Sequence, residues 1–400
     1  MSGARASWRR RFQLWLIGRL RSSRVWPAGL ADKRTDLDRL GQRLPASVMV
    51  FFGSSVDALY QLRPWLPALS NLNEMHPVSL VFRDSRVAGQ VRAESGLDCI
   101  TLSTYGQLDQ ILSVSDVKLA LYVNPDPINF ESLRFTSLIH VYLGHGDSDK
   151  GVSVSNQVKA YDYCFLAGQA AIDRTSSSVM AYDAVARSVL IGQPQLDAPP
   201  VTGHPDPARP TILYAPTWEG SQPSVSYGSA ITHGHEVVTT LKDAYRVIYR
   251  PHPLSGVADA EYGQADAALR EIADRVDTDV TLEQSFADAD LLITDVSAVT
   301  LNWLPTGKPV MVTESTAPKP PSPLMQALPL LSADADVAAA VRLHLETDPT
   351  ADARRTMIEH YLGDTTPGVA TARFIQACTS LIEQRDAQWA AQQAQGATGP

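Results

Sequence analysis

Short, continuously apolar runs recur along the chain, separated by stretches long enough to form helices. The runs in the first half are SVMVFF (47–52), VSLVFR (78–83), VKLALYV (117–123), LIHVYL (138–143) and YCFLA (163–167). Those in the second half are TILYAP (211–216), YRVIYR (245–250), DLLITD (290–295) and PVMVT (309–313). Because apolar residues fill these runs instead of alternating with polar ones, the pattern predicts parallel strands that are buried on both faces.

A proline-rich stretch interrupts this series of strands. DAPPVTGHPDPARP (197–210) contains five prolines and predicts a linker at 201–210. We therefore expect an α/β fold in which two Rossmann-like, doubly wound domains, 45–200 and 211–350, face each other across a cleft. Ligands of such sheets bind beyond the carboxyl ends of the strands, so the cleft is the expected active site.

The two ends of the chain differ from the middle. Residues 351–393 have a helical composition, with a turn at 363–368, and 394–400 read as a frayed, disordered tail. Residues 1–44 predict a basic amphipathic helical segment, in which 1–31 carry seven arginines and no acid. Its apolar stretch is too short to span a bilayer. The helix is expected either to lie on an anionic membrane surface or to pack on the body of the protein.

Composition narrows the class of protein. A hydrophobic content of 44% and a charged content of 19% are typical of a soluble globular protein, and the net charge of −9 argues against a nucleic-acid binder. The cysteines at 99, 164 and 378 form no CxxC pair, which predicts neither a disulfide framework nor a thiolate metal site. We therefore expect a reducing, cytoplasmic setting.

The motif GHGDSDK (144–150) follows the strand LIHVYL. Gly144 and Gly146 permit a sharp turn that would project His145 into the cleft. His145 is then a candidate general base or an ordinary turn residue, and Lys150 could meet an anionic substrate. Asp147 or Asp149 could orient the imidazole. A magnesium site built from aspartates is less favoured, because the carboxylates are not densely clustered.

A second motif, YRPHP (249–253), comes directly after another strand. Arg250 and His252 lie on the same side of an extended backbone that Pro251 and Pro253 stiffen. The pair is a candidate phosphate clamp or part of an ordinary proline-bounded loop. His233 and His235, in ITHGHEVV, are instead expected in a solvent loop.

The third motif, LLITDVSAVTLNW (291–303), joins a buried strand to a predicted helix. Thr294 and Asp295 end the strand, and Ser297 stands at the expected N-cap. The amides of Ala298, Val299 and Thr300 would open the helix and could bind a diphosphate. Ser297 is therefore a structural cap, a group that faces a ligand, or both.

Together GHGDSDK, LYAPTW, RPHP and ITDVSAVTLNW, in this order, resemble the CDP-glycerol glycerophosphotransferase family of teichoic-acid synthesis over roughly residues 115–385. The resemblance implies a GT-B architecture with a C-terminal helix that crosses back. It also implies an enzyme at the inner face of the cell membrane that moves glycerol phosphate, or a related polyol phosphate, from a CDP-linked donor to a lipid-linked polymer of the cell envelope. CMP would be released, and the reaction requires no cofactor and no metal.

The family's motifs fall on particular residues of this chain. The histidine and lysine of a His-Gly-Thr-Pro-Leu-Lys element match His145 and Lys150, and an Arg-x-His-Pro element matches Arg250, His252 and Pro253. A Thr-Asp-Tyr-Ser-Ser turn matches residues 294–298. His145 and His252 are thereby implied to be catalytic. The candidates for substrate binding are Gly144, Gly146, Lys150, Thr217, Arg250, Pro253, Thr294, Asp295, Ser297, Ala298 and Val299.

Three departures accompany the resemblance. Asp147–Ser148–Asp149 replace Thr-Pro-Leu, Ala298 replaces the second serine of the turn, and Asn302 replaces an aspartate. Two other functions therefore stay open. One is a GT-B glycosyltransferase that uses a nucleotide sugar, and the other is a non-catalytic partner protein that has kept the fold.

Overall fold

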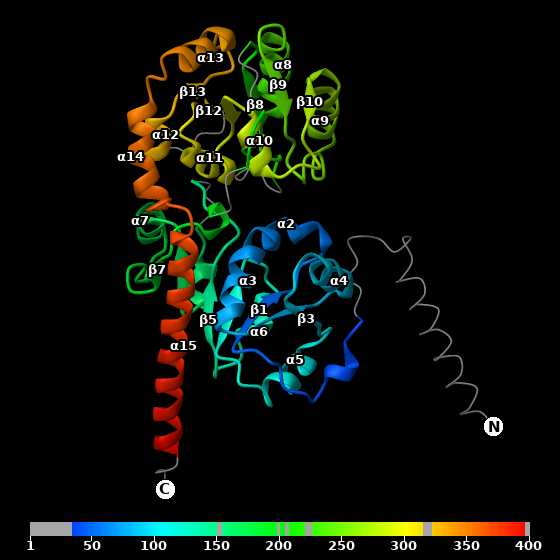
Figure 1. Cartoon of the computed structure of the whole chain (residues 1–400), viewed down its shortest axis with the longest axis vertical. Helices are drawn as coiled ribbons and strands as arrows, with labels where there is room; N and C mark the ends of the chain where they lie inside the picture. Colours follow the sequence, from blue (N-terminus) through cyan, green and yellow to red (C-terminus); the bar gives the residue numbers. More distant parts are fainter. Residues whose placement is uncertain are drawn as a thin grey trace, which may run out of the picture. The chain divides into compact units, whose positions relative to one another are not determined.

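The computed structural model describes residues 34–149, 154–197, 201–204, 208–220, 226–314 and 322–396. Two parallel sheets organise these residues, and helices are interleaved between the strands (Figure 1). The α/β prediction and the two Rossmann-like sheets of a GT-B architecture are confirmed.

The first sheet has the order β3-β2-β1-β4-β5-β6-β7, and β1 to β6 pair in parallel. Its strands are β1 Val48–Phe52, β2 Val78–Phe82, β3 Asp98–Thr101, β4 Leu119–Tyr122, β5 Ile139–Tyr142, β6 Tyr163–Leu166 and β7 Ser188–Leu190. The helices between them are α2 Leu59–Leu62, α3 Leu66–Met75, α4 Ser85–Glu94, α5 Tyr105–Leu112, α6 Asn129–Ser132 and α7 Gln169–Ser178. Every residue of β1 and β2 is buried, as the continuous apolar runs predict.

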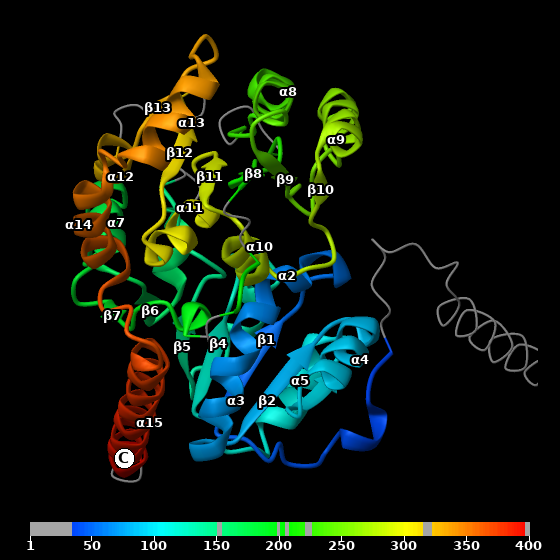
Figure 2. The same ribbon diagram turned by 45° about the horizontal axis from the view of Figure 1, so that its top comes forward.

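The second sheet has the order β10-β9-β8-β11-β12-β13, and all its pairs are parallel. Its strands are β8 Thr211–Ala215, β9 Arg246–Tyr249, β10 Arg275–Val276, β11 Leu291–Thr294, β12 Val310–Thr313 and β13 Leu330–Leu331. Its helices are α8 His235–Leu241, α9 Ala260–Ile272, α10 Leu282–Asp288, α11 Ala298–Trp303, α12 Pro323–Ala327, α13 Val337–Glu346 and α14 Ala351–Leu362. Figure 2 shows α8 and α9 side by side next to β9 and β10.

Strand order reverses at one place in each sheet. In the first sheet the chain builds outward from β1 to β3 and then returns to the other side of β1 with β4. In the second sheet the same reversal lies between β8 and β11. The loops that leave neighbouring strands diverge at such a point, which is where doubly wound sheets bind ligands.

The compact units are delimited differently from the predicted domains. One unit contains the described residues up to His145, then Ala160–Cys164 and the residues from Ile375 onward; the other contains those of Gly146–Lys159 and Phe165–Phe374. Helix α7 therefore groups with the second sheet instead of the first. The reason is its close packing on α14, where a Cβ at Gly168 would lie 2.5 Å from the backbone of Tyr361.

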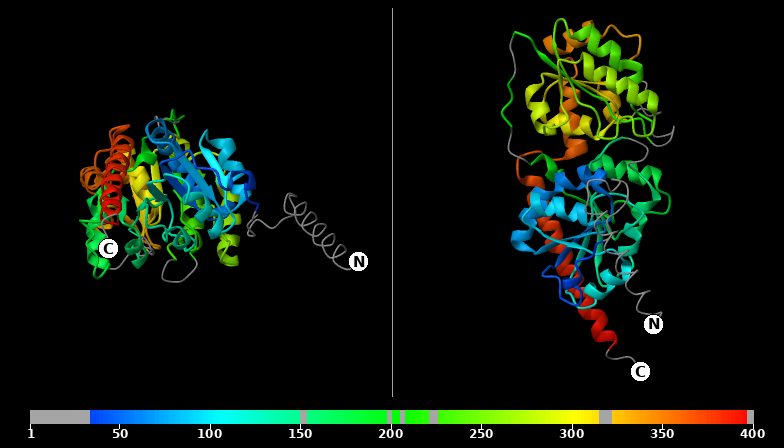
Figure 3. Two further views of the ribbon diagram at one scale, coloured as in Figure 1. Left: turned by 90° about the horizontal axis from the view of Figure 1, so that it is seen from below. Right: turned by 90° about the vertical axis from the view of Figure 1, so that its right-hand side faces the viewer.

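Helix α15, Val369–Gly396, follows the predicted turn and is continuous. It begins in the second unit, and from Ile375 onward it belongs to the first, as the expected helix that crosses back requires. Its side chains hold the first unit through a Lys118–Asp386 ion pair and a 2.8 Å bond from Gln384 Nε2 to the Tyr163 hydroxyl. Figure 3 shows α15 in red along this unit. The helix runs to Gly396, so a disordered tail from 394 was wrong at its start, because alanine and glutamine favour helix.

The described part of the predicted N-terminal helix has another structure. Residues 34–44 contain a short 3₁₀ turn, Leu37–Arg39, and lie against β3, where Asp36 N donates to Thr101 O at 3.0 Å. Leu44 is buried in the core of the first unit. These residues therefore belong to the first unit, whereas residues 1–33, and the membrane surface predicted for 1–31, lie outside the described ranges. Within those ranges, no helix combines the length and apolarity that a membrane span needs.

Two expectations of local structure were wrong. The segment around His233 and His235 is a π-helical turn, Ala230–Gly234, followed by α8, and not a solvent loop. His233 is buried beside Thr232, whose hydroxyl lies 2.8 Å from its Nδ1. The run at 98–101 was not predicted as a strand, because the polar residues Asp98 and Thr101 stand at its two ends; it is β3.

Candidate active site

Gly144 makes the turn that ends β5. Its φ is +66°, a left-handed conformation in which a side chain is strained. Its carbonyl oxygen accepts a 2.7 Å hydrogen bond from the indole nitrogen of the buried Trp65. The next residue, His145, is exposed, and its ring meets Tyr60 edge-on at a centroid distance of 6.0 Å. A fixed turn therefore presents the imidazole at the carboxyl end of the sheet, as the motif predicts.

The Asp147–Ser148–Asp149 segment is anchored within the second unit. Arg174, on α7, forms ion pairs with both Asp147 and Asp149, and the latter contact is 2.8 Å. Burial raises the pKa of Asp147 above its ordinary value, although the guanidinium opposes this shift. The guanidinium of Arg174 therefore balances the negative charges of both aspartates. Lys150, the next residue, lies outside the described residues.

Asp149 connects this segment to two further elements. Its Oδ2 accepts from the hydroxyl of Tyr361, on α14, at 2.9 Å and from the hydroxyl of Ser322, which caps α12. Asp149 itself is 8% exposed. The segment that follows His145 is thus bonded to α7, α12 and α14 together. These bonds give Asp149 a structural role.

Asp295 occupies the point of strand reversal in the second sheet. The side chain is fully buried, and its Oδ2 accepts from the backbone amides of Thr217 at 2.7 Å and Ser229 at 3.1 Å. Its Oδ1 accepts from the hydroxyl of Thr313 at 2.7 Å. Burial raises the pKa of Asp295, and these hydrogen bonds oppose the shift. Asp295 therefore ties the loop after β11 to the loop after β8.

Thr294, the residue before Asp295, is likewise buried and hydrogen-bonded within the protein. It is fully buried, and its hydroxyl donates to Ala215 O at 2.7 Å. Protein groups surround both side chains, and the contact with a substrate that the motif predicts for Thr294 and Asp295 stays a prediction. Thr217 is also buried, and its backbone carbonyl accepts from the Tyr262 hydroxyl.

Ser297 stands at the N-cap of α11, as predicted, but its hydroxyl makes no capping bond. The buried Oγ has no hydrogen-bond partner among the described residues, although Ser297 is only 7% exposed. Ala298 and Val299 follow in partly buried positions. A Cβ at Gly146 would lie 3.2 Å from that of Ala298, so the first and third motifs meet here within the second unit.

Arg250 is turned toward the start of α10. Its Nη1 donates to Ser285 Oγ at 2.8 Å and to the carbonyl oxygens of Val280 and Thr281 at 3.0 and 3.3 Å. Burial lowers the pKa of its guanidinium. Carbonyl oxygens and the Ser285 hydroxyl therefore hold one nitrogen of the Arg250 guanidinium, and the phosphate clamp expected of Arg250 and His252 stays a prediction.

His252 is partly buried, and its orientation is defined. Its Nδ1 accepts from Leu254 N at 3.1 Å, so in the neutral ring the proton is on Nε2. The ring stacks on Trp218, with the planes 20° apart and the centroids separated by 6.2 Å. Pro251 before it is buried and Pro253 after it is exposed. A histidine with a fixed Nε2–H donor at the carboxyl end of β9 is suited to an anionic oxygen.

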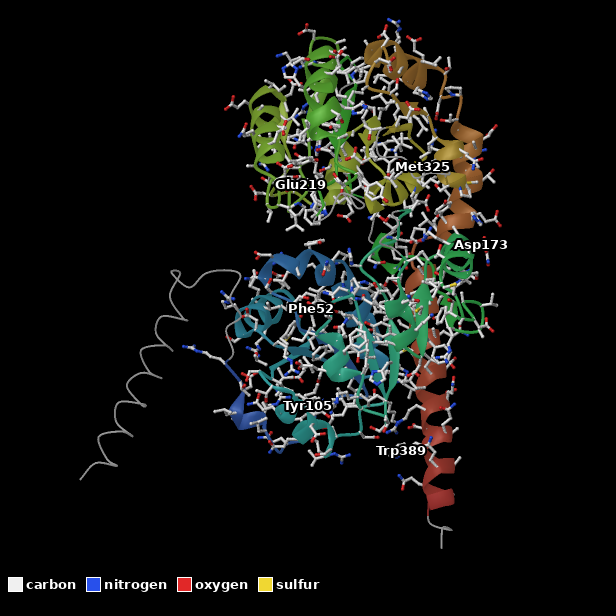
Figure 4. The ribbon with its side chains drawn as sticks, turned by 180° about the vertical axis from the view of Figure 1, so that it is seen from behind. Phe52, Tyr105, Asp173, Glu219, Met325 and Trp389 are labelled. Atoms are coloured by element: carbon white, nitrogen blue, oxygen red, sulfur yellow. The ribbon has the colours of Figure 1, made fainter. Side chains whose placement is uncertain are left out.

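Two residues that hold segments of the site lie outside the sequence motifs. Glu219, labelled in Figure 4, lies four residues after β8 and accepts from Gly256 N, Ala258 N and Asp259 N at 2.8 to 3.1 Å. It thereby holds the loop that follows His252. The other is Arg174, which is 25 residues from Asp149. Neither pairing has a local sequence pattern, so reasoning from the motifs missed both.

Comparison with known proteins supports the resemblance. Residues 153–315 match the family model of CDP-glycerol:poly(glycerophosphate) glycerophosphotransferase. This match contains Arg250, His252 and Ser297, and it begins after His145 and Lys150. The comparison with curated proteins gave no match.

Solved structures resemble the fold of this chain over most of its length. The wall teichoic acid polymerase TagF has 14% identity and a TM-score of 0.54, over 85% of this chain and 90% of that one. A variant of TagF solved with CDPG gives 13% identity and the same TM-score. A putative UDP-N-acetylglucosamine 2-epimerase from Listeria monocytogenes has 14% identity and a TM-score of 0.59, over 84% and 96% of the two chains. At these identities the likeness shows the fold.

Replacing Arg174 with methionine should strongly destabilise the second unit. The variant removes the positive charge that balances the buried Asp147 and Asp149. Removal of one partner of a buried ion pair lowers the free energy of unfolding by about 3–5 kcal/mol. Urea unfolding is the measurement, and Arg187→Met, which changes an exposed arginine, is the matched control. Equal stability of the two variants would contradict the anchoring role.

Replacing Asp295 with asparagine should lower the free energy of unfolding by about 1.5–3 kcal/mol, because an amide is a weaker acceptor for three donors and its NH₂ faces some of them. The same change at the exposed Asp279 should have little effect. Urea unfolding of both variants checks this expectation. A loss at Asp295 no larger than that at Asp279 would refute it.

Proposed function

We infer that this chain, whose residues 153–315 match the family model of CDP-glycerol:poly(glycerophosphate) glycerophosphotransferase, is a transferase of the teichoic-acid type. We propose that it moves glycerol phosphate, or a related polyol phosphate, from a CDP-linked donor to a hydroxyl of a lipid-linked cell-wall or capsule polymer. The donor is a substrate, and CMP is the leaving product.

One observation carries the proposal. Within the matched segment, the loops after β8, β9 and β11 come together at the strand reversal of the second sheet, where Asp295 and Glu219 fix them. Their groups suited to an anion are His252 Nε2 and the unpartnered hydroxyl of Ser297. Fixed donors at a strand reversal are suited to a nucleoside diphosphate.

The donor side of the reaction follows from these groups. His252 donates from Nε2 to a diphosphate oxygen, and Ser297 Oγ supplies a second hydrogen bond. Arg250 contributes positive charge from its place against α10 and helps to position the loop. Phosphoryl transfer depends mainly on positioning and on electrostatic stabilisation, which fits a site made of oriented donors.

The acceptor side requires a base. His145 is exposed on a rigid turn, and its imidazole takes the proton of the acceptor hydroxyl. The oxygen attacks the β-phosphorus and forms the new phosphodiester bond, while the bond from that phosphorus to the bridging oxygen breaks. The electron pair leaves with CMP. The transfer of the proton to His145 and the departure of CMP need no cofactor and no metal.

The setting of the enzyme is part of the proposal. A lipid-linked acceptor places the reaction at the cytoplasmic face of the cell membrane. The basic residues of 1–31, seven arginines without an acid, are suited to an anionic lipid surface. Peripheral attachment through this segment is therefore the proposed mode of contact.

A donor panel tests the function. Purified protein is incubated with CDP-glycerol, CDP-ribitol, UDP-sugars and GDP-sugars in the presence of a lipid-linked acceptor, and the released nucleotide is identified. Release of CMP from a CDP-polyol is expected. Release of UDP or GDP would favour a nucleotide-sugar glycosyltransferase instead, and calorimetry that finds no binding of any CDP-linked compound would favour a non-catalytic partner protein.

Changing His145 to alanine should lower the turnover of the CDP-linked donor by about 10²-fold or more, because a positioned general base contributes a factor of this size. His235→Ala, which changes an exposed histidine on α8, serves as the control and should retain turnover. Both variants should unfold at wild-type urea concentrations. Near wild-type turnover of His145→Ala would remove His145 from the mechanism.

A further inference from the structure

The strand reversal of the first sheet holds polar side chains that the proposed reaction has not used. Ser54 follows β1, Asn124 and Asp126 follow β4, and Tyr60 and Gln61 lie on α2. These residues and His145, at the end of the neighbouring β5, belong to the first unit. A doubly wound sheet binds its ligand at such a reversal.

These side chains form one network of hydrogen bonds, which runs outward from Asn124 Nδ2 along two branches. Asp126 accepts from the hydroxyl of Ser54, and Ser54 Oγ accepts from Asn124 Nδ2 at 2.9 Å. Asn124 Nδ2 also donates to Gln61 Oε1 at 2.8 Å. This bond fixes the Gln61 amide so that its Nε2 donates to the Tyr60 oxygen at 3.2 Å.

The direction of the network determines what Tyr60 can do. Since its oxygen accepts from Gln61, its own O–H donates in another direction. The ring of Tyr60 stands edge-on to His145, with their planes 87° apart. Burial raises the pKa of Tyr60, so the phenol keeps its proton at neutral pH. The ring of Tyr60 is therefore held beside the proposed base, with its oxygen bonded to Gln61.

Asn124 supplies an independent indication of a ligand. The residue is 2% exposed, and its Oδ1 is buried without a hydrogen-bond partner among the described residues. Buried acceptors are nearly always satisfied, and an exception calls for an explanation. The hydroxyl of a bound molecule would satisfy this oxygen.

The charge of the cluster selects the class of molecule. Ser54, Tyr60, Gln61, Asn124 and Asp126 include one carboxylate and no cation, which disfavours a phosphate at this position. Hydroxyl groups both donate and accept, and they match a set that contains a phenol, amides and a carboxylate.

We propose that Tyr60 and Asn124 bind the terminal polyol of the acceptor, a vicinal diol, with Tyr60 donating to one hydroxyl while His145 takes the proton of its neighbour. Gln61, Ser54 and Asp126 are positioning residues that keep the Tyr60 hydroxyl turned toward the acceptor. The inference rests on the proposed function for the chemistry that follows binding.

Glycerophosphoglycerol is the probe, because it is water-soluble and presents a terminal glycerol joined through a phosphodiester. Tyr60→Phe removes only the hydroxyl. Two constants for glycerophosphoglycerol are measured: its KM with CDP-glycerol as donor, and its Kd by NMR without donor. Both should rise by about tenfold, which is the effect of losing one hydrogen bond. The affinity for CDP-glycerol should stay unchanged. Tyr105→Phe, on α5, where Tyr105 stacks on Phe135, is the matched control (Figure 4).

Gln61→Met tests the positioning role, and it should raise the same KM and Kd while leaving the affinity for CDP-glycerol unchanged. A network that is only structural would instead change unfolding and spare the acceptor constants. Unchanged constants in both variants would overturn the inference while leaving the proposed function intact, and so would a wild-type protein that fails to bind glycerophosphoglycerol. Tyr60-dependent binding without turnover of any CDP-linked donor would support the polyol subsite and refute the proposed transfer.

Discussion

The buried carboxylate of Asp295 is the interaction on which the second half of the molecule depends. A charge without solvent exposure is tolerated only where donors surround it, and here two backbone amides and one hydroxyl do so. These donors come from the loop after β8, the segment before α8 and the end of β12. One side chain therefore determines the course of the loops at the strand reversal. The groups that we assign to the donor diphosphate, His252 and Ser297, are placed on this frame.

The two sheets share one strand order but stabilise their reversals by different means. In the second sheet a carboxylate binds backbone donors, so the loops are fixed whatever side chains they carry. In the first sheet polar side chains, among them the carboxylate of Asp126, bind one another, and the network ends at Tyr60 with the acceptor oxygen of Asn124 unsatisfied. Loops that backbone hydrogen bonds fix in one conformation are suited to bind a nucleotide that is the same in every round of the reaction. A network of side chains is suited to select among hydroxyl-bearing acceptors, since each member can be changed separately.

Much of the fold follows from the sequence because buried parallel strands are continuously apolar. The nine predicted runs contain β1, β2, β4, β5, β6, β8, β9, β11 and β12. The missed strands, β3, β7, β10 and β13, are the edge strands of the two sheets, where polar residues such as Asp98 and Ser188 are tolerated. The place of His145, His252 and Ser297 at element ends was predictable from the motifs. The contacts of Trp65 with Gly144, of Trp218 with His252 and of Arg174 with Asp149 were not, because tertiary packing decides such pairings and no local pattern marks them.

The departures from the family pattern have structural counterparts, and these bear on whether the chain is an enzyme. The Asp147–Ser148–Asp149 segment is balanced by Arg174, and Asn302 accepts from Gln193 Nε2 at 2.8 Å, so both changes lie in bonds internal to the protein. Ala298 lies close to Gly146 and has no hydroxyl to offer a ligand. The unpartnered hydroxyl of Ser297 is therefore the group that we assign to ligand binding there. A chain that had lost its chemistry would have no reason to keep such a hydroxyl unsatisfied or to present an exposed His145 on a glycine turn. The unsatisfied groups of Ser297 and Asn124, one in each unit, therefore favour a working transferase over a partner protein that has only kept the fold.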